Sequence, residues 1–474
     1  MTELTVAIGL LCMLVCVAFA VLHSLRLGHV TLLDWSVLGM GGIYGGGWAL
    51  IAFVTKTEEN PVWERSLLPF EHLYPLHTLS TFILLGSIYI GWLLMGSLRF
   101  RPIKKLNFAS ENSDGRLILA GWVLLIIALF MQFFYSHAYG GLMGLLEYSA
   151  SIRSGIFTVE NPMSFLKPFG GMTFFSSFLF FGLWLGGCRR WIVKIGFILA
   201  FSFSFYILFS WLGRIGFFVY LATLVLSIMV ARRVRPLPLL VGGGLTMLFI
   251  LVGAYQVSVW LNIKVADDIT SFLARELSFP FVSFFAQIDS GEHLLRGFWD
   301  ILVAPVYLLP SSLWTKWVEN VSQVNTELVI GAPKGVAGVT GAIPVDLITL
   351  GLMQAALAGI AGVGFIFGAG LRLLQKLLDR VRNFSVRAVF EAHLAIKIAV
   401  LAIFYAQPAL VVSDNFALLV SIIIIVFVVK LPRIRLFKKP KGLNSVDQYS
   451  PSPVKPPCPR AFTTKDENSV AEGS

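Results

Sequence analysis

The chain has 474 residues, of which 57% are hydrophobic and only 13% charged, and its mean hydropathy is +0.80. A soluble domain could not bury so much apolar surface, so this composition predicts a protein surrounded largely by lipid. The formal net charge of +11 comes from short clusters of Lys and Arg at the ends of apolar runs. Because the cations do not line one face, the charge argues against a nucleic acid as partner.

Apolar runs dominate the chain in order. Spanning the hydrocarbon of a bilayer takes about 20 apolar residues in a helix. Eleven runs approach this length, which predicts an all-α, polytopic integral membrane protein with about 11 transmembrane helices. The predicted spans are Leu4 to Leu22, Val30 to Phe53, Leu76 to Leu98, Leu117 to Phe134, Phe169 to Gly187, Ile192 to Trp211, Ile215 to Val230, Leu237 to Trp260, Asp346 to Leu371, Ala392 to Val412 and Phe416 to Val429.

The connections between these runs indicate the orientation. Lys and Arg near span ends are retained on the cytoplasmic side, and most of them lie in one set of alternate connections. We therefore predict that the N-terminus lies outside the cytoplasmic membrane and the C-terminus inside. Residues 1–431 form the membrane domain, and residues 432–474, basic and then rich in Pro and Ser, form a disordered cytoplasmic tail.

Cysteine usage agrees with this orientation. Cys12 and Cys16 fall in the first span, Cys188 at an inner end and Cys458 in the tail. We therefore expect no disulfide in the outer loops, and no spacing of metal ligands appears.

The largest connection, residues 261–345, lies on the predicted outer side of the membrane and contains no run long enough to span. Its apolar stretch from Phe298 to Leu309 is short and interrupted by proline, so we expect a re-entrant or interfacial segment. The loop ends in a glycine-rich segment, Gly331 to Pro344, whose backbone amides could converge on an anion beside Lys334.

A short amphipathic helix is predicted near the start of this loop, from Ala266 to Phe281. Asp267 or Asp268 can cap its N-terminus. The periodicity places Arg275 and Glu276 on or beside its polar side.

Two further arginines lie near the predicted outer surface. Arg214 stands at a tight turn between two spans, where an unpaired cation is costly and usually functional; the alternative is snorkelling to lipid headgroups. Arg153 follows a predicted surface helix around Leu142 to Ser149 and could likewise contact only headgroups.

Several of these features together resemble a known class. The N-out eleven-span layout, the arginine in GRIGFF, and a large outer loop with LPSSLW and TGAIP resemble the Wzy class of O-antigen polymerases, over about Phe70 to Lys430. In LPSSLW, Ser311 stands where we would expect an arginine. The positions that match the class's pyrophosphate-binding arginines are Arg214, Arg275, Arg153 and Arg296.

The resemblance implies a glycosyltransferase of the bacterial cytoplasmic (inner) membrane. It would join undecaprenyl-pyrophosphate-linked oligosaccharide repeat units into a surface polysaccharide on the periplasmic face. Its partners would be that lipid-linked substrate, membrane lipid and a chain-length regulator protein.

The residues suit such a reaction. Pyrophosphate is already a good leaving group, so it needs fixed positive charge rather than a general acid, and guanidinium supplies that charge without a metal or another cofactor. The attacking sugar hydroxyl needs a base or an oriented acceptor. Glu276 could instead pair with Arg275, and His293 could be a solvated surface histidine. The candidate bases in the loop are Glu276, His293, Glu292 and Asp289.

Two other functions stay open. Glu391, His393 and Lys397 at the inner end of the tenth span would suit a proton-coupled carrier or a flippase for lipid-linked oligosaccharides, although snorkelling to the inner surface also explains Lys397. No repeat relates the halves of the chain, as inverted-repeat carriers require. An O-antigen ligase would use the same donor and differ only in its acceptor.

Overall fold

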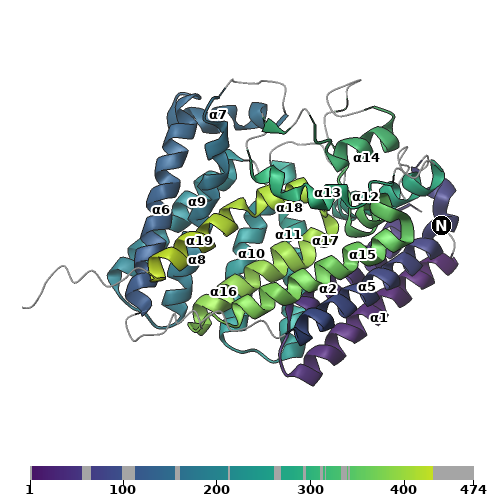
Figure 1. The fold of residues 1–474 in the computed structure, drawn as a ribbon, viewed down its shortest axis with the longest axis horizontal. Helices are drawn as coiled ribbons and strands as arrows, with labels where there is room; N and C mark the ends of the chain where they lie inside the picture. The colour runs from purple at the N-terminus through teal and green to yellow at the C-terminus, as the bar shows by residue number, and fades with distance from the viewer. Residues whose placement is uncertain are drawn as a thin grey trace, which may run out of the picture. The chain divides into compact units, whose positions relative to one another are not determined.

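In the computed structural model, every regular element of the described residues is a helix, as predicted (Figure 1). Of residues 113, 150–154 and 214 it describes the backbone alone. The described residues are 3–55, 66–98, 113–154, 161–211, 214–260, 268–291, 295–309, 313–314, 317–332, 339 and 342–430.

The described part of the chain consists of helices joined by connections of different lengths. Five segments are not α-helical: η1 and η6 are π-helices, and η2, η3 and η4 are 3-10 helices. In the first half they are α1 (Glu3–Leu27), α2 (Leu32–Met40), η1 (Gly41–Gly46), α3 (Gly47–Val54), η2 (Leu68–Leu73), α5 (Tyr74–Ser97), α6 (Ser113–His137), α7 (Gly141–Ser154), η3 (Ser164–Gly171), α8 (Met172–Leu185), α9 (Trp191–Ser210) and α10 (Arg214–Ala231). In the second half they are α11 (Pro236–Trp260), α12 (Ile269–Asp289), α13 (Trp299–Leu302), η4 (Ala304–Leu308), α14 (Val321–Ile330), α15 (Leu347–Leu378), α16 (Phe384–Leu394), η6 (Ala395–Val400), α17 (Leu401–Phe404), α18 (Pro408–Asp414) and α19 (Phe416–Lys430).

Among the described residues, eight helices are long and apolar enough to cross a membrane, or nine if α18 and α19, bent by 42°, count as one span. The chain is therefore a multi-pass membrane protein. The seventh predicted span is a shorter apolar helix, Ile215–Ala231, and the tenth is divided among α16, η6, α17 and α18. The count of eleven and the orientation remain predictions.

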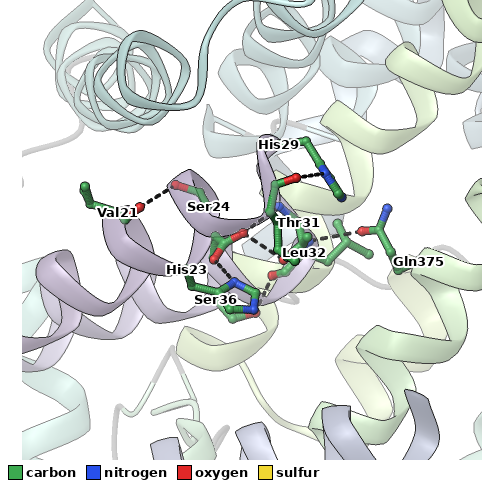
Figure 2. Close-up of polar contacts among 10 residues, drawn as sticks. Val21, His23, Ser24, His29, Thr31, Leu32, Ser36 and Gln375 are labelled. Atoms are coloured by element: carbon green, nitrogen blue, oxygen red, sulfur yellow. Dashed lines mark hydrogen bonds and ion pairs between the residues drawn. The ribbon is translucent and has the colours of Figure 1, made fainter. Parts of the chain in front are cut away.

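A buried carboxylate ties α1 and α2 together at one end of the bundle. Asp34 is fully buried; its Oδ2 accepts hydrogen bonds from the Thr31 amide and hydroxyl at 2.7 and 2.8 Å, and its Oδ1 lies 2.6 Å from Nδ1 of His23. The Leu32 amide donates to Oε1 of Gln375 on α15 (Figure 2). Three helices thus satisfy each other's polar groups in a largely buried position.

Helices α5 and α15 lie side by side in close contact (Figure 1). Glycines make this approach possible, because a Cβ on Gly91 would lie 2.2 Å from the Phe365 carbonyl oxygen, and one on Gly368 would lie 2.0 Å from that of Ile88. Small residues at such contacts are the usual way in which membrane helices pack backbone against backbone.

The amphipathic helix predicted in the large loop is confirmed as α12. Its N-cap is Asp268, whose side chain accepts hydrogen bonds from the Ser271 amide and the Thr270 hydroxyl. These bonds, with that from Thr270 the largest contribution, lower the pKa of Asp268 to about 2. The predicted short helix around Leu142 to Ser149 is likewise confirmed, as part of α7.

Helix α12 does not lie only at the surface, since its second half is buried against the spans. The rings of Phe281 and Phe285 pack on Trp48 of α3 with centroids 5.1 and 5.9 Å away, and Phe284 packs on His77 of α5 at 5.0 Å. The loop therefore contributes a helix to the core, and this burial orients the first half of α12, which carries Arg275 and Glu276.

Asn325 on α14 joins the parts of the large loop. Its Nδ2 donates to the Ser283 hydroxyl at 3.0 Å and to the Ile343 carbonyl at 3.2 Å, and its Oδ1 accepts from Gln287 at 3.4 Å. The Ile343 amide donates to the neighbouring Thr326 hydroxyl at 2.8 Å. One fully buried amide therefore connects α12, α14 and the segment that leads into α15.

We predict that Asn325→Ala lowers the free energy of unfolding by about 1–3 kcal/mol, because it leaves buried partners without hydrogen bonds. Thermal unfolding in detergent micelles measures the change. Gln323→Ala, on the exposed side of the same helix, is the control and should change the free energy of unfolding by less than about 0.5 kcal/mol. Equal stabilities of the two variants would contradict this role for Asn325.

Candidate functional site

A polar cavity of about 570 Å³, cavity 1, opens beside α12. Arg275 and Glu276 line it from α12, and three polar residues at the start of α14 line it from the other side. Its full lining is Arg275, Glu276, Phe279, Asn320, Ser322, Gln323, Ala342, Pro344, Tyr405, Gln407 and Leu410.

The walls of cavity 1 are held by contacts between distant segments. Phe279 of α12 stacks on Tyr405, with ring centroids 5.6 Å apart and planes at 27°. Gln407 donates to the side-chain oxygen of Asn320, and the Ala406 amide donates to the Val345 carbonyl at 2.9 Å. The segment between α17 and α18 is therefore held both to the N-cap residue of α14 and to the segment that leads into α15.

A second and more apolar cavity of about 680 Å³, cavity 2, lies among η3, α8, α10, η6 and α18. Phenylalanines of α8 and Tyr220 form much of its wall, and its polar residues include Lys167, His393, Lys397 and Asp414. Tyr405 and Leu410 line both cavities, so the polar and the apolar space share a wall.

The structure corrects the expectation that Lys397 snorkels to the inner surface. Its Nζ lies 2.7 Å from Oδ2 of Asp414, which precedes the last predicted span at that span's outer end. The helix that carries Lys397 begins at Phe384, capped by Asn383, rather than at Ala392 as the apolar run suggested. Lys397 therefore lies away from the predicted inner end of its span and lines cavity 2.

Arg214 begins α10 next to cavity 2. Trp211 before it, and Ile215 and Gly216 after it, all line that cavity. Its side chain lies outside the described part of the structure, so its direction stays a prediction. Sequence analysis thus placed Arg214 and Arg275 in one site, and the structure brings their backbones to two adjoining cavities.

Arg296 has a different environment. Its Nε and Nη2 donate to the two oxygens of Asp300 at 2.7 and 2.9 Å, and Nη1 lies 3.4 Å from Glu319. Burial lowers the pKa of the guanidinium, but these hydrogen bonds and charges outweigh burial and raise it above its ordinary value. Arg296 does not line either cavity. The bidentate ion pair of Arg296 with Asp300 supports a structural role for this arginine instead of the predicted pyrophosphate contact.

This ion pair stands at a break in α15. Ala355 and Ala356 leave the helical conformation there, with φ/ψ of −161°/46° and 51°/−140°. A Cβ on Gly351 would lie 2.5 Å from the Cα of Ile360, whereas residues nine apart in a straight helix are about 13 Å apart. The chain therefore turns back on itself at this point.

The polar groups freed by the break are capped from the loop. The amides of Arg296 and Gly297 donate to the carbonyls of Met353 and Gln354, both at 2.9 Å. Nε2 of Gln354 donates to Asp300 at 2.8 Å. Asp300 thus serves both the arginine and the broken helix, which explains why a fully buried carboxylate is tolerated here.

Three other predicted site residues have side chains outside the described part of the structure. Arg153 lies one residue before the end of α7, and only its backbone is described, so its role stays a prediction. His293 and Lys334 lie outside the described residues, as do Glu292, Ser311 and most of the glycine-rich segment. Within the described ranges, no group of three His, Cys, Asp or Glu side chains is arranged to hold a metal ion.

Sequence reasoning missed several residues of the site. Tyr405 and Gln407 lie inside the predicted tenth span without a motif, and Lys167 and Asp414 lie at the edges of apolar runs. The one available signal was the polar stretch that contains Asn320, Asn325 and Thr326.

The fold and the two cavities define the class to which the chain belongs: an all-helical, multi-pass membrane protein in which a polar cavity adjoins an apolar one. No family model, curated protein or solved structure matches the chain.

We predict that Arg296→Met destabilises the protein by about 3–5 kcal/mol, because it leaves the buried Asp300 carboxylate without its counter-charge. Arg275→Met, on an exposed side chain, should cost less than about 1 kcal/mol. Thermal unfolding in detergent compares the two. The double variant Arg296→Met with Asp300→Asn removes both charges and should recover much of the loss; no recovery would contradict the ion-pair explanation.

Proposed function

We propose that this chain is a membrane glycosyltransferase of the Wzy type, which polymerises undecaprenyl-pyrophosphate-linked oligosaccharide repeat units on the periplasmic face of the bacterial cytoplasmic membrane. The observation that carries the proposal is cavity 1: it holds Arg275 and Glu276, is lined by the large loop, and shares a wall with an apolar cavity. A lipid-linked saccharide has the same division into a charged head and an apolar tail.

In this proposal Arg275 stabilises the negative charge that develops on the pyrophosphate as the glycosidic bond breaks. Glu276 accepts the proton of the attacking sugar hydroxyl. The amides of Asn320, Gln323 and Gln407 around them offer donors and acceptors for sugar hydroxyls. Arg214, at the rim of the apolar cavity, is the second cation, and the N-out, eleven-span topology belongs to the same proposal.

Two of the three ionisable residues that suggested a carrier, Glu391 and Lys397, form ion pairs. Lys397 pairs with Asp414, and Arg387 pairs with Glu391 at 3.4 Å and with Asp379 at 2.7 Å. These ion pairs supply a structural reason for charges within the helices, so they weaken the argument for a proton path. A ligase, which uses the same donor, is separated from a polymerase by the experiment below.

We predict that Arg275→Ala and Arg214→Ala each slow chain growth roughly 10²- to 10³-fold, as expected when one group that stabilises transition-state charge is removed. The protein should still insert at wild-type amount. Sizing of the surface glycan on a gel measures chain growth, and Arg232→Ala, at a predicted inner span end, is the control. Full-length glycan in both site variants would remove the site assignment.

Deletion of the gene distinguishes the three functions on the same gel. Surface glycan with single repeat units is the expected result for a polymerase. Free polymer on the carrier lipid would indicate a ligase, and repeat units trapped inside the cell would indicate a flippase.

A further inference from the structure

Three buried polar atoms on residues that line cavity 2 have no hydrogen-bond partner among the described residues: Nε1 of Trp211, Nδ1 of His393 and Oδ1 of Asn415. Nδ2 of Asn415 donates to the Val411 carbonyl at 2.7 Å, which fixes the orientation of that amide. Buried polar groups are nearly always paired in proteins. Their gathering around one cavity therefore indicates a ligand with polar atoms of its own.

Cavity 2 also has two cations near these atoms. Lys397 comes from η6, and Lys167 comes from η3, which packs against the start of α19 through Phe169 and Phe416, with ring centroids 5.0 Å apart. Lys167 forms no ion pair with a described residue, while Lys397 pairs with Asp414 at 2.7 Å. The cavity therefore has more positive than negative charge on its lining, which suits an anion.

The remainder of the wall is aromatic and apolar. Phe174, Phe175, Phe178 and Tyr220 line it together with Trp211. A volume of about 680 Å³ is typical of pockets that enclose a small ligand, so the cavity would hold a head group and only the first part of a lipid tail.

We propose that cavity 2 is a second lipid-binding site, which takes the phosphate end of an isoprenoid lipid, with Lys397 exchanging Asp414 for the lipid phosphate and Lys167 as the second cation. The assignment of an isoprenoid tail rests on the proposed function. The phosphate site rests only on the cations and unpartnered polar atoms that line cavity 2. The exchange is favourable because the Asp414 carboxylate is 47% exposed, so its pair with Lys397 is partly solvated and weak. A phosphate offers more charge and more acceptor oxygens than a carboxylate.

Equilibrium binding of radiolabelled farnesyl phosphate to the purified full chain in detergent tests the site. The titration uses the Arg275→Ala background, which removes the arginine from cavity 1. Lys397→Met and Lys167→Met should each weaken binding roughly ten- to a hundredfold, as expected for a lost charged hydrogen bond. Lys397→Arg, which keeps the positive charge, should bind farnesyl phosphate as the unsubstituted Lys397 does. Lys194→Met is the control, because Lys194 lies over Trp191 and lines neither cavity.

Asp414→Asn is the decisive variant. If Asp414 competes with phosphate for Lys397, removal of its charge should tighten farnesyl phosphate binding several-fold. If the pair is only structural, Asp414→Asn should weaken binding as Lys397→Met does, and that result would overturn the exchange. Wild-type affinity in both Lys397→Met and Lys167→Met would overturn the site itself.

Two further ligands separate this inference from the proposed function. Farnesol should bind far more weakly than farnesyl phosphate, and equal affinities would overturn the phosphate contact. Dodecyl phosphate has the same head on a linear chain and should bind more weakly; equal affinity would overturn the isoprenoid assignment alone. Chain growth in Arg275→Ala cells tests the polymerase proposal and is independent of these titrations.

Discussion

Backbone polar groups that are shielded from water must find partners inside the protein, and this constraint shapes the structure around the cavities. The break in α15 exposes carbonyl groups in the middle of a helix, and amides from the large loop cap them. At the N-terminus of α15, Asp346 accepts hydrogen bonds from the Ile348 amide and the Tyr44 hydroxyl at 3.0 and 2.7 Å. The loop is therefore a structural part of the helix bundle.

This arrangement explains how charged residues reach a site in so apolar a chain. Helix α12 is anchored by phenylalanines in its second half, so its first half can present Arg275 and Glu276 to cavity 1. The segment from Tyr405 to Leu410 then separates this polar space from the aromatic walls of cavity 2. A polar cavity and a more apolar one thus adjoin, which suits an amphipathic ligand.

The two arginines of the loop show how similar residues acquire different roles. In the sequence, Arg275 and Arg296 are equivalent cations in a predicted outer loop. Arg275 lies at the cavity, whereas Arg296 is bound to a buried aspartate four residues along the chain. The difference depends on whether a carboxylate is buried within reach, and burial is a property of the packed chain.

Apolar run length and local periodicity determined the helical class, the membrane-spanning character, the amphipathic α12 and its Asp268 cap, because these depend on neighbours in sequence. The adjoining cavities, the broken α15 and the Lys397–Asp414 pair depended on tertiary structure. Even the position of Lys397 was misjudged, since polar residues before the apolar run continued its helix. Hydrophobicity shows where a chain prefers lipid, but contacts between distant segments decide which charges meet.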